Sequence, residues 1–414
     1  MHFGIISPPV PGHIHPFGAL GRELQARGHR VTLFHMPDVE ERARHEGLDF
    51  VPIGGSNHPR GSLAESLAQL GRLSGFAALR FTIAAVEKTT EMFCCDAPEA
   101  LQKAGIGFLL ADQTEPVGSS IAQRLGIPFV TIANALAMNR EASVPPPFTA
   151  WRYSKSAPAR IRNRLGYAMS DRAMTSIRRV IGKYRAQWKL PALRSAAETF
   201  SNVAQISQQP PAFDYPRREL PGSFHYVGPL RRELSMPLPF RWEKLDGRPL
   251  VYASLGTLQN ARAETFRCFV GACRGLGVQL VLTHGGGLDQ AAEADLAREA
   301  IVVSYAPQLQ LLERASLTLT HAGLNTVLDS LSCGVPMVTV PITFEQPAIA
   351  RRVEWCGAGR TVPFSKLNAA RLRTAIQDVL GNSAYRRNAE RVRESIRHAG
   401  GVRRAADLIE RFAG

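Results

Sequence analysis

Residues 317–326 read Leu-Thr-Leu-Thr-His-Ala-Gly-Leu-Asn-Thr, and this short stretch decides the fold. Its first four residues form a strand-like run, which predicts a β-strand at Leu317–Thr320. Its last four residues open an expected helix at Asn325–Cys333. A strand that passes through a short turn into a helix is the repeating unit of parallel α/β proteins.

The same alternation continues on both sides of this stretch. The other expected strands are Phe3–Ser7, Arg30–His35, Gly107–Ala111, Pro128–Ile132, Asn202–Ser207, Pro249–Ser254, Val278–Thr283, Ile301–Val303 and Val335–Val340. Helices are expected between them, at Gly18–Arg27, Val117–Arg124, Ala261–Arg274 and Pro347–Cys356. The pattern breaks at 227–248, where Gly228-Pro229, Pro237 and Pro239 indicate a connector.

These patterns predict an α/β protein with two Rossmann-like domains, at residues 1–226 and 249–390. The connector at 227–248 joins them, and an Arg-rich helical segment at 391–414 is expected to pack back on the N-terminal domain. Ligands of open parallel sheets bind at the carboxyl ends of the strands. We therefore expect the functional site in a cleft between the two domains.

Composition excludes several classes of protein. Of the 414 residues, 45% are apolar and 21% are charged, and no stretch reaches the roughly 18 uninterrupted apolar residues of a membrane-spanning helix. The first residues lack the pattern of a signal peptide. The six cysteines form no CxxC pair and have no histidine at metal spacing. A reduced, cytoplasmic protein without structural zinc is expected.

The net charge of +15 is concentrated in one segment. Residues 151–200 contain only Asp171 and Glu198 as acidic side chains but twelve basic ones: Arg152, Lys155, Arg160, Arg162, Arg164, Arg172, Arg178, Arg179, Lys183, Arg185, Lys189 and Arg194. Such a segment favours an anionic partner, which could be nucleic acid, a phosphorylated substrate or an acidic lipid surface. A solvated helical face is the alternative.

The stretch after the strand at 317–320 has the chemistry of a phosphate site. Gly323-Leu324-Asn325-Thr326 opens a helix, so free backbone amides and the helix dipole meet the His321 imidazole and a hydroxyl at one point. Asp329 follows one helical turn later, where a carboxylate can hold the two hydroxyls of a ribose.

A second motif, Pro11-Gly12-His13-Ile14-His15-Pro16, follows the first strand. The unperturbed pKa of histidine suits a general base, and His13 is expected at the carboxyl edge of the first sheet. Asp112 ends another strand at the same edge, where its carboxylate could orient the imidazole. The small residues of Ser254-Leu255-Gly256-Thr257 allow a close backbone approach to a phosphate.

The block 305–346 resembles the nucleotide-sugar signature of UDP-dependent glycosyltransferases of the two-domain glycosyltransferase-B fold. The resemblance implies that Tyr305 stacks on uracil, Gln308 lies beside the base and ribose, and Asp329 holds the ribose. It implies that Gly323, His321, Asn325 and Thr326 contact the diphosphate, above the loop of Ser254, Gly256 and Thr257. Glu345 and Gln346 match the pair that grips the sugar, and His13 and Asp112 match the catalytic pair. Tyr305 stands in place of the family's tryptophan and Glu345 in place of its aspartate, which leaves the hexose open.

Further segments resemble bacterial zeaxanthin glucosyltransferases. They are Ala111–Pro116, Met138–Glu141, Ala204–Gln208, Phe213–Arg217, Tyr226–Arg231 and Ala253–Gln259. This resemblance implies an inverting, metal-independent transfer of a hexose, glucose above all, from a UDP-sugar to a lipophilic alcohol such as a carotenoid. It implies no cofactor and no metal site, and the sequence contains no Asp-x-Asp motif.

Three alternatives remain open from the sequence. A related enzyme could act on a soluble macrolide- or flavonoid-like acceptor, or the basic segment could belong to a nucleic-acid-binding protein, although it carries no recognised nucleic-acid motif. A nucleotide-sugar epimerase has no need for the Gly12-His13 motif. For a lipophilic acceptor, residues 151–200 are expected to dock on an anionic membrane, peripherally and on its cytoplasmic face. Trp151, Tyr153, Tyr184 and Trp188 are the aromatic candidates for insertion there.

Overall fold

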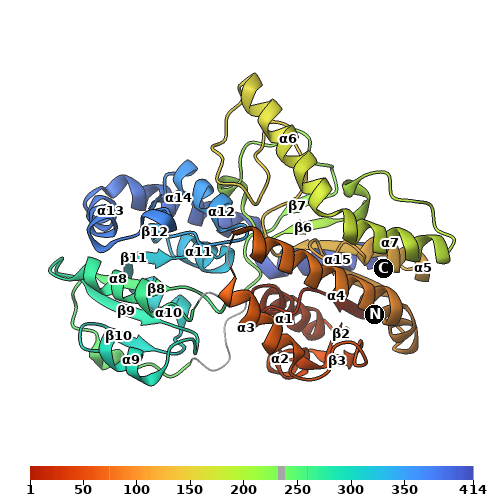
Figure 1. Ribbon diagram of the computed structural model, residues 1–414, viewed down its shortest axis with the longest axis horizontal. Helices are drawn as coiled ribbons and strands as arrows, with labels where there is room; N and C mark the ends of the chain where they lie inside the picture. The colour runs from red at the N-terminus through yellow and green to blue at the C-terminus, as the bar shows by residue number, and fades with distance from the viewer. Residues whose placement is uncertain (74, 232–237, 259, 414) are drawn as a thin grey trace.

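The computed structural model describes residues 1–73, 75–231, 238–258 and 260–413, which form two parallel α/β units side by side (Figure 1). The N-terminal sheet has the strand order β3-β2-β1-β4-β5-β6-β7, and the C-terminal sheet has the order β10-β9-β8-β11-β12-β13. Residues 232–237 of the expected connector and Gln259 lie outside the described residues. The predicted fold class is confirmed.

The strands lie close to their expected positions. In the first sheet they are β1 (His2–Ile6), β2 (Arg30–His35), β3 (Asp49–Pro52), β4 (Phe108–Asp112), β5 (Phe129–Ala133), β6 (Gln205–Ser207) and β7 (Phe224–Tyr226). In the second they are β8 (Leu250–Ser254), β9 (Gln279–Thr283), β10 (Ile301–Val303), β11 (Ala315–Thr320), β12 (Met337–Thr339) and β13 (Gly359–Thr361). The sequence did not predict β3, β7 or β13, which are all edge strands.

Helices cover both faces of each sheet, as parallel sheets require. In the N-terminal half they are α1 (Pro11–Ala26), α2 (Glu40–His45), α3 (Ser62–Arg72), α4 (Gly75–Lys103), α5 (Gly118–Leu125), α6 (Ala157–Ala173) and α7 (Thr175–Gln187). The later helices are α8 (Ala263–Cys273), α9 (Gln290–Leu296), α10 (Gln308–Arg314), α11 (Leu324–Ser332), α12 (Gln346–Trp355), α13 (Ala369–Gly381), α14 (Ser383–Ala399) and α15 (Gly401–Ala413).

The last two helices belong to different units. Ala389 and Val392 of α14 are buried against the C-terminal unit, whereas Leu408 and Ile409 of α15 belong to the core of the N-terminal unit. The chain crosses between the units at Gly400-Gly401, where φ is +89° and +59° and glycine is therefore favoured. Arg27, the residue that caps the end of α1, then pairs with Asp407 and Glu410 of α15, and these ion pairs tie α15 to the first domain.

The basic segment 151–200 forms α6 and α7, and its four expected inserting aromatic rings are packed against protein. The ring of Tyr153 stacks on Tyr215 at 4.8 Å, and the Arg162 guanidinium lies 4.8 Å from the Trp151 ring. Tyr184 is buried, and Trp188 packs beside it against the N-terminal core. Of the four rings only Tyr184 is buried and so not placed to insert into a membrane, whereas Trp151, Tyr153 and Trp188 are half-buried and their insertion stays a prediction. Within the described residues, we find no helix that combines the length and the apolarity needed to cross a bilayer.

Candidate active site

A histidine and a carboxylate meet at the carboxyl edge of the N-terminal sheet. His13 Nδ1 lies 2.8 Å from Asp112 Oδ2, and Asp112 is the last residue of β4. His13 belongs to the first turn of α1, because the helix begins at Pro11 and not at Gly18 as expected. Proline suits this position because its fixed φ is helical and the first turn needs no amide donor. His15, the competing histidine, instead contacts Glu46 at 2.9 Å.

The Asp112 carboxylate is held in one orientation by several donors. Its Oδ1 accepts hydrogen bonds from the Thr114 amide at 2.9 Å and the Thr114 hydroxyl at 2.6 Å. Its Oδ2 accepts from Asn134 Nδ2 at 2.9 Å in addition to its contact with His13. The motifs in the sequence did not indicate Asn134. Its signal was available, because it directly follows β5, the neighbour of β4, and adjacent parallel strands end at the same edge.

The electrostatics favour an imidazole that readily takes up a proton. Burial disfavours the imidazolium, but Asp112, together with the nearby Glu345 and Glu115, raises the pKa of His13 above its usual value overall. Burial likewise opposes ionisation of Asp112, yet His13 and Thr114 lower its pKa overall. A charged carboxylate thus faces an imidazole with raised affinity for a proton, which is the arrangement of a general base and its partner.

Two further buried carboxyl groups surround this pair. Burial, together with the nearby Asp112 charge, raises the pKa of Glu115 to about 8, so Glu115 is mostly neutral at pH 7. Burial also raises the pKa of Glu345, which belongs to the C-terminal unit and interacts electrostatically with His13. Asp112 is the carboxylate in direct contact with His13, and its pKa is lowered whereas those of Glu115 and Glu345 are raised.

His321 lies across the interface, between β11 and α11, and is wedged between two glycines. A Cβ added to Gly256 would lie 2.8 Å from His321 Cε1, and one added to Gly323 would lie 2.6 Å from its Nε2. Gly256 has φ +69°, which glycine adopts readily, whereas Ala322 has φ +67°, so the backbone next to His321 is strained at Ala322. Burial lowers the pKa of His321 to about 4, which leaves the imidazole neutral at pH 7.

The N-terminus of α11 lies beside His321 and is suited to an anion. Gly323 is its N-cap residue, so no side chain there can accept a bond from the first-turn amides. Asn325 Nδ2 donates to the Gly12 carbonyl of α1 at 2.9 Å. That carbonyl is free because the residue four positions later is Pro16, which has no N–H. The expected phosphate helix and the expected base helix therefore touch each other.

The carboxylate expected to bind a ribose is already surrounded by donors. Asp329 Oδ2 accepts from Gln308 Nε2 at 2.6 Å, and its Oδ1 accepts from Arg231 Nε at 2.7 Å. Tyr252 in turn donates to Gln308 Oε1 at 2.9 Å. The structure thus brings Gln308 and Asp329 together as the sequence predicted, and it adds Arg231 and Tyr252.

The other expected donor-site residues lie on neighbouring loops. Tyr305 is 59% exposed, and its hydroxyl donates to the Gly285 carbonyl at 3.2 Å, so the ring lies at the surface. Ser254 Oγ accepts from the Gly256 amide at 3.2 Å. Thr257 is exposed in the same loop, and Thr326 is buried in the first turn of α11.

Glu345 and Gln346 begin α12 and lie at the contact between the two units. Glu345 Oε2 accepts from the Leu136 amide of the N-terminal unit at 2.9 Å. Gln346 Oε1 accepts from the amides of Ile342 and Thr343, so it fixes the loop before α12. Both side chains are therefore oriented by backbone contacts, one of them across the interface.

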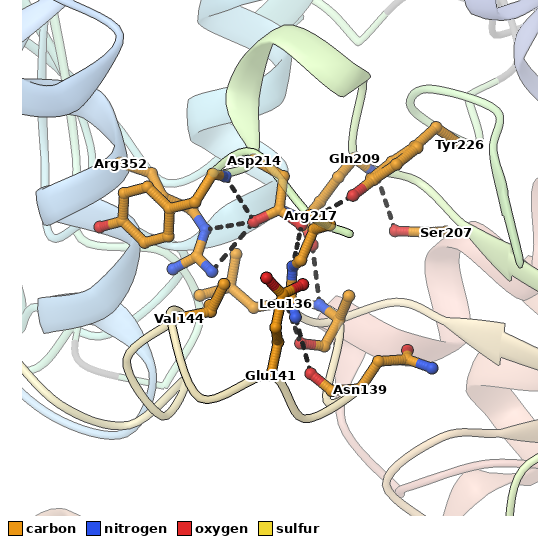
Figure 2. A network of polar contacts seen from close by, with 12 residues as sticks. Leu136, Asn139, Glu141, Val144, Ser207, Gln209, Asp214, Arg217, Tyr226 and Arg352 are labelled. Atoms are coloured by element: carbon orange, nitrogen blue, oxygen red, sulfur yellow. Dashed lines mark hydrogen bonds and ion pairs between the residues drawn. The ribbon is translucent and has the colours of Figure 1, made fainter. Parts of the chain in front are cut away.

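A buried ion pair holds α12 against the N-terminal unit (Figure 2). Arg352 Nε donates to Asp214 Oδ1 at 3.1 Å, and both side chains are almost fully buried. Asp214 Oδ2 also accepts from Arg217 at 3.0 Å and from the Tyr226 hydroxyl at 2.9 Å. Because α12 carries Glu345 at its start, this network fixes the distance between Glu345 and the His13 edge.

The described residues contain no group of three or more His, Cys, Asp or Glu side chains that could hold a metal ion. The groups that the structure brings together here are a half-buried histidine, a buried carboxylate and a helix N-terminus. A nucleotide diphosphate on one side and an acceptor hydroxyl on the other side would fit these groups.

Comparison with known proteins identifies the class. A family profile described as UDP-glucoronosyl and UDP-glucosyl transferase matches residues 73–403. The chain belongs to this family and is a glycosyltransferase.

Two curated relatives extend the match over nearly the whole chain. A zeaxanthin glucosyltransferase of Pantoea ananas is 35% identical over 414 residues, which cover 99% of this chain and 95% of that protein. A zeaxanthin glucosyltransferase of Pseudescherichia vulneris is 36% identical and covers 99% of this chain and 97% of that protein.

Solved structures agree on the fold. The kitacinnamycin glycotransferase has a TM-score of 0.77 and 24% identity, covering 100% of this chain and 99% of its own. The calicheamicin glycosyltransferase has a TM-score of 0.77 and 22% identity, and the match covers 99% of this chain and 97% of that chain. At such identities they show the fold alone, which is the glycosyltransferase-B fold that the sequence predicted.

Proposed function

We propose that this glycosyltransferase transfers glucose from UDP-glucose to a hydroxyl group of a lipophilic acceptor such as zeaxanthin, with inversion at the anomeric carbon. The observation that carries the proposal is the part-buried His13–Asp112 pair, which lies across the domain interface from the N-terminus of α11. The names of the two curated relatives supply the acceptor and the sugar.

In the proposed reaction His13 acts as the general base. Its imidazole takes the proton of the acceptor hydroxyl while the hydroxyl oxygen forms a bond to the anomeric carbon. The bond from that carbon to the diphosphate oxygen breaks on the opposite face, and UDP leaves with the electron pair. Asp112 stabilises the imidazolium that forms, because its carboxylate is 2.8 Å from Nδ1 and is fixed by Thr114 and Asn134.

The leaving diphosphate gains negative charge, and groups on the C-terminal unit are placed to meet it. The first-turn amides of α11 and the neutral His321 imidazole supply hydrogen-bond donors, together with the positive end of the helix dipole. Thr326 adds a hydroxyl in the same turn. These donors take the place of a divalent cation in the proposal.

The remaining residues position the donor. Tyr305 stacks on the uracil, and Gln308 and Asp329 hold the ribose, with Ser254, Gly256 and Thr257 below the diphosphate. Glu345 and Gln346 bind hydroxyls of the sugar. The Leu136 contact and the Asp214–Arg352 pair hold Glu345 near His13, which supports this assignment.

A carotenoid alcohol is almost insoluble in water, so we propose that the enzyme meets it at a membrane. The basic segment 151–200 would attach the protein peripherally, because each Lys or Arg close to an anionic surface contributes about 1 kcal/mol of attraction. Arg185 does not take part in this attraction, since it is buried and donates to Ser120 Oγ.

The test is a product screen with the purified enzyme. Several UDP-sugars are offered against zeaxanthin dispersed in detergent and against soluble macrolide and flavonoid aglycones. We expect glucosylated zeaxanthin from UDP-glucose as the main product. Transfer to the soluble aglycones without transfer to zeaxanthin would contradict the proposed acceptor while leaving the glycosyltransferase assignment intact.

A further inference from the structure

Helix α6 exposes a stripe of large apolar side chains. Ile161, Leu165 and Met169 follow one another at four-residue spacing, so they lie along one side of the helix. They are 58%, 61% and 72% exposed, among the highest values of any large apolar side chains in the described residues. A single exposed leucine is ordinary, but a continuous stripe on one helix indicates a binding surface.

The exposure of the stripe does not come from a helix that lacks contacts with the protein. The opposite side of α6 packs against the N-terminal unit, and its residues Ala159, Asn163, Gly166 and Tyr167 are all buried. A Cβ added to Gly166 would lie 2.7 Å from the Trp151 ring, which shows how closely this side is packed. The helix stands out from the rest of the N-terminal unit (Figure 1), and its apolar stripe is exposed.

A row of arginines runs beside the apolar stripe. Arg160, Arg164 and Arg172 are exposed and each lies one residue or three residues from a member of the stripe. The acidic residue of α6, Asp171, is held by two bonds of 2.7 Å from Arg140 and does not cancel this row. Arg162 is engaged elsewhere, since it bonds Asn163 and stacks on Trp151.

We propose that α6 lies in the interface of an anionic lipid bilayer, with Ile161, Leu165 and Met169 inserted among the acyl chains and the three arginines on the lipid phosphates. An amphipathic helix with apolar and basic stripes side by side has the composition of interfacial membrane helices. The inference rests on the proposed function, because a lipid-dissolved acceptor is what gives such a surface a use.

The charge of this surface selects the bilayer over other occupants. A second copy of the chain would bring the same arginines face to face in a two-fold contact, and like charges repel. A nucleic acid would satisfy the arginines but would leave the apolar stripe in water. An anionic bilayer satisfies both at once.

The inner face of α6 connects this surface to the active site. Asn163 Nδ2 donates to the Ala142 carbonyl at 3.0 Å, and the Tyr167 hydroxyl donates to the Val144 carbonyl at 3.1 Å. Both carbonyls belong to the loop that follows β5. At the start of this loop Asn134 bonds Asp112, and Leu136 bonds Glu345. A docked α6 therefore fixes the acceptor-side loop close to the lipid surface.

The test measures binding of the full chain to vesicles in the absence of acceptor. Vesicles of neutral phosphatidylcholine are compared with vesicles that also contain phosphatidylglycerol, in co-sedimentation at low and high salt. One variant carries Ile161→Gln, Leu165→Gln and Met169→Gln, and a second carries Arg160→Gln, Arg164→Gln and Arg172→Gln. A control variant with the same loss of charge carries Arg371→Gln, Arg387→Gln and Arg397→Gln, which are exposed on α13 and α14.

We expect the wild type to bind anionic vesicles and to be released by salt. Each α6 variant should lose at least tenfold in partitioning, while the control variant should bind as the wild type does. Thermal unfolding of each variant checks its fold, and Met169→Gln alone, at the most exposed position of the stripe, provides a second variant that should lose part of the affinity.

Unchanged binding by the apolar-stripe variant would overturn the insertion of α6. Equal partitioning of the wild type to neutral and anionic vesicles, no binding at all, or an equal loss in the control variant would overturn the inference as well. Glucosylation of detergent-dispersed zeaxanthin is assayed in parallel and needs no bilayer. Its absence would count against the proposed acceptor, whereas vesicle binding tests α6 alone.

Discussion

His13 is half-buried in the first turn of α1 and His321 is buried just past β11, and their pKa values move in opposite directions. The pKa of His13 is raised, whereas that of His321 is lowered to about 4. The difference lies in the carboxyl groups around each ring, because Asp112 bonds His13, with Glu345 and Glu115 nearby, whereas glycines 256 and 323 enclose His321. Burial alone produces a neutral hydrogen-bond donor, and burial beside a carboxylate produces a base.

This contrast explains how one residue type can serve both halves of a transfer reaction. A base must accept a proton from the acceptor, so a raised pKa is useful on the N-terminal side. A group that contacts a diphosphate must stay a constant donor, so a neutral imidazole is suitable on the C-terminal side. The two histidines should therefore respond differently to every perturbation below.

The largest effect is expected for His13→Ala. Removal of a general base costs about 10²- to 10⁴-fold in rate, and we expect a loss of turnover of about 10³-fold. The affinity for UDP should stay within about twofold, because the base acts on the acceptor. Steady-state kinetics with UDP-glucose and calorimetry with UDP measure the two quantities.

His15→Ala is the matched control, because this side chain is on the same helix and contacts Glu46 rather than Asp112. Its turnover should remain close to that of the wild type. Near-normal turnover in His13→Ala would remove the proposed base, and a large loss of UDP affinity would move His13 to the donor side.

A smaller effect is expected for Asp112→Asn, about 10- to 100-fold in turnover, since the base remains. The carboxylate raises the pKa of His13, so its loss should lower that pKa. Because His13 must be unprotonated to act, activity falls as pH drops through its pKa. The acid limb of kcat/KM should therefore shift to lower pH in the variant.

A pH–rate profile of both proteins checks this sign. An acid limb that stays in place, or one that moves to higher pH, would show that Asp112 does not control His13. Thr114→Val keeps the carboxylate and removes one of its donors, so it should shift the limb much less.

The sequence predicted the centre of each sheet better than its edges. Central strands such as β1 and β8 are apolar runs buried on both faces, so their pattern is clear. The edge strands β3, β7 and β13 are only three or four residues long and are mostly half-buried, with polar residues among them. The edge strand β10, with the sequence Ile-Val-Val, was predicted because its side chains are all apolar.

Sequence motifs likewise indicated the expected site residues, but they did not indicate the residues that hold those side chains in place. His13, Asp112, His321 and Asp329 lie in short motifs with a recognisable spacing. Arg231, which pairs with Asp329, comes from the connector some hundred positions earlier in the chain, and no local pattern indicates such a partner. The sequence did not predict the exposed stripe of α6 for a different reason. Periodicity alone does not tell which face of a helix packs against the protein.

On the donor side, His321→Ala should weaken UDP binding about tenfold, or about 1.4 kcal/mol. Gly256→Ala should have a similar effect without removing any polar group, because its φ is +69° and its new Cβ would lie 2.8 Å from the imidazole. Calorimetry with UDP alone measures both. Unchanged UDP affinity in both variants would separate His321 from the diphosphate. In contrast to Asp112→Asn, neither variant should shift the acid limb.

The smallest expected effect is that of metal removal. If the amides of α11 and the neutral His321 meet the charge on the leaving diphosphate, turnover in excess EDTA should remain within about twofold of its value in Mg²⁺. The groups beside the His321 imidazole are the first-turn amides of α11 and the Thr326 hydroxyl, which donate hydrogen bonds to an anion. Turnover that disappears in EDTA and returns with Mg²⁺ or Mn²⁺ would overturn the proposed charge stabilisation. Residual activity in His321→Ala that responds to Mg²⁺, when the wild type does not, would support it, since a cation could then replace the missing donor.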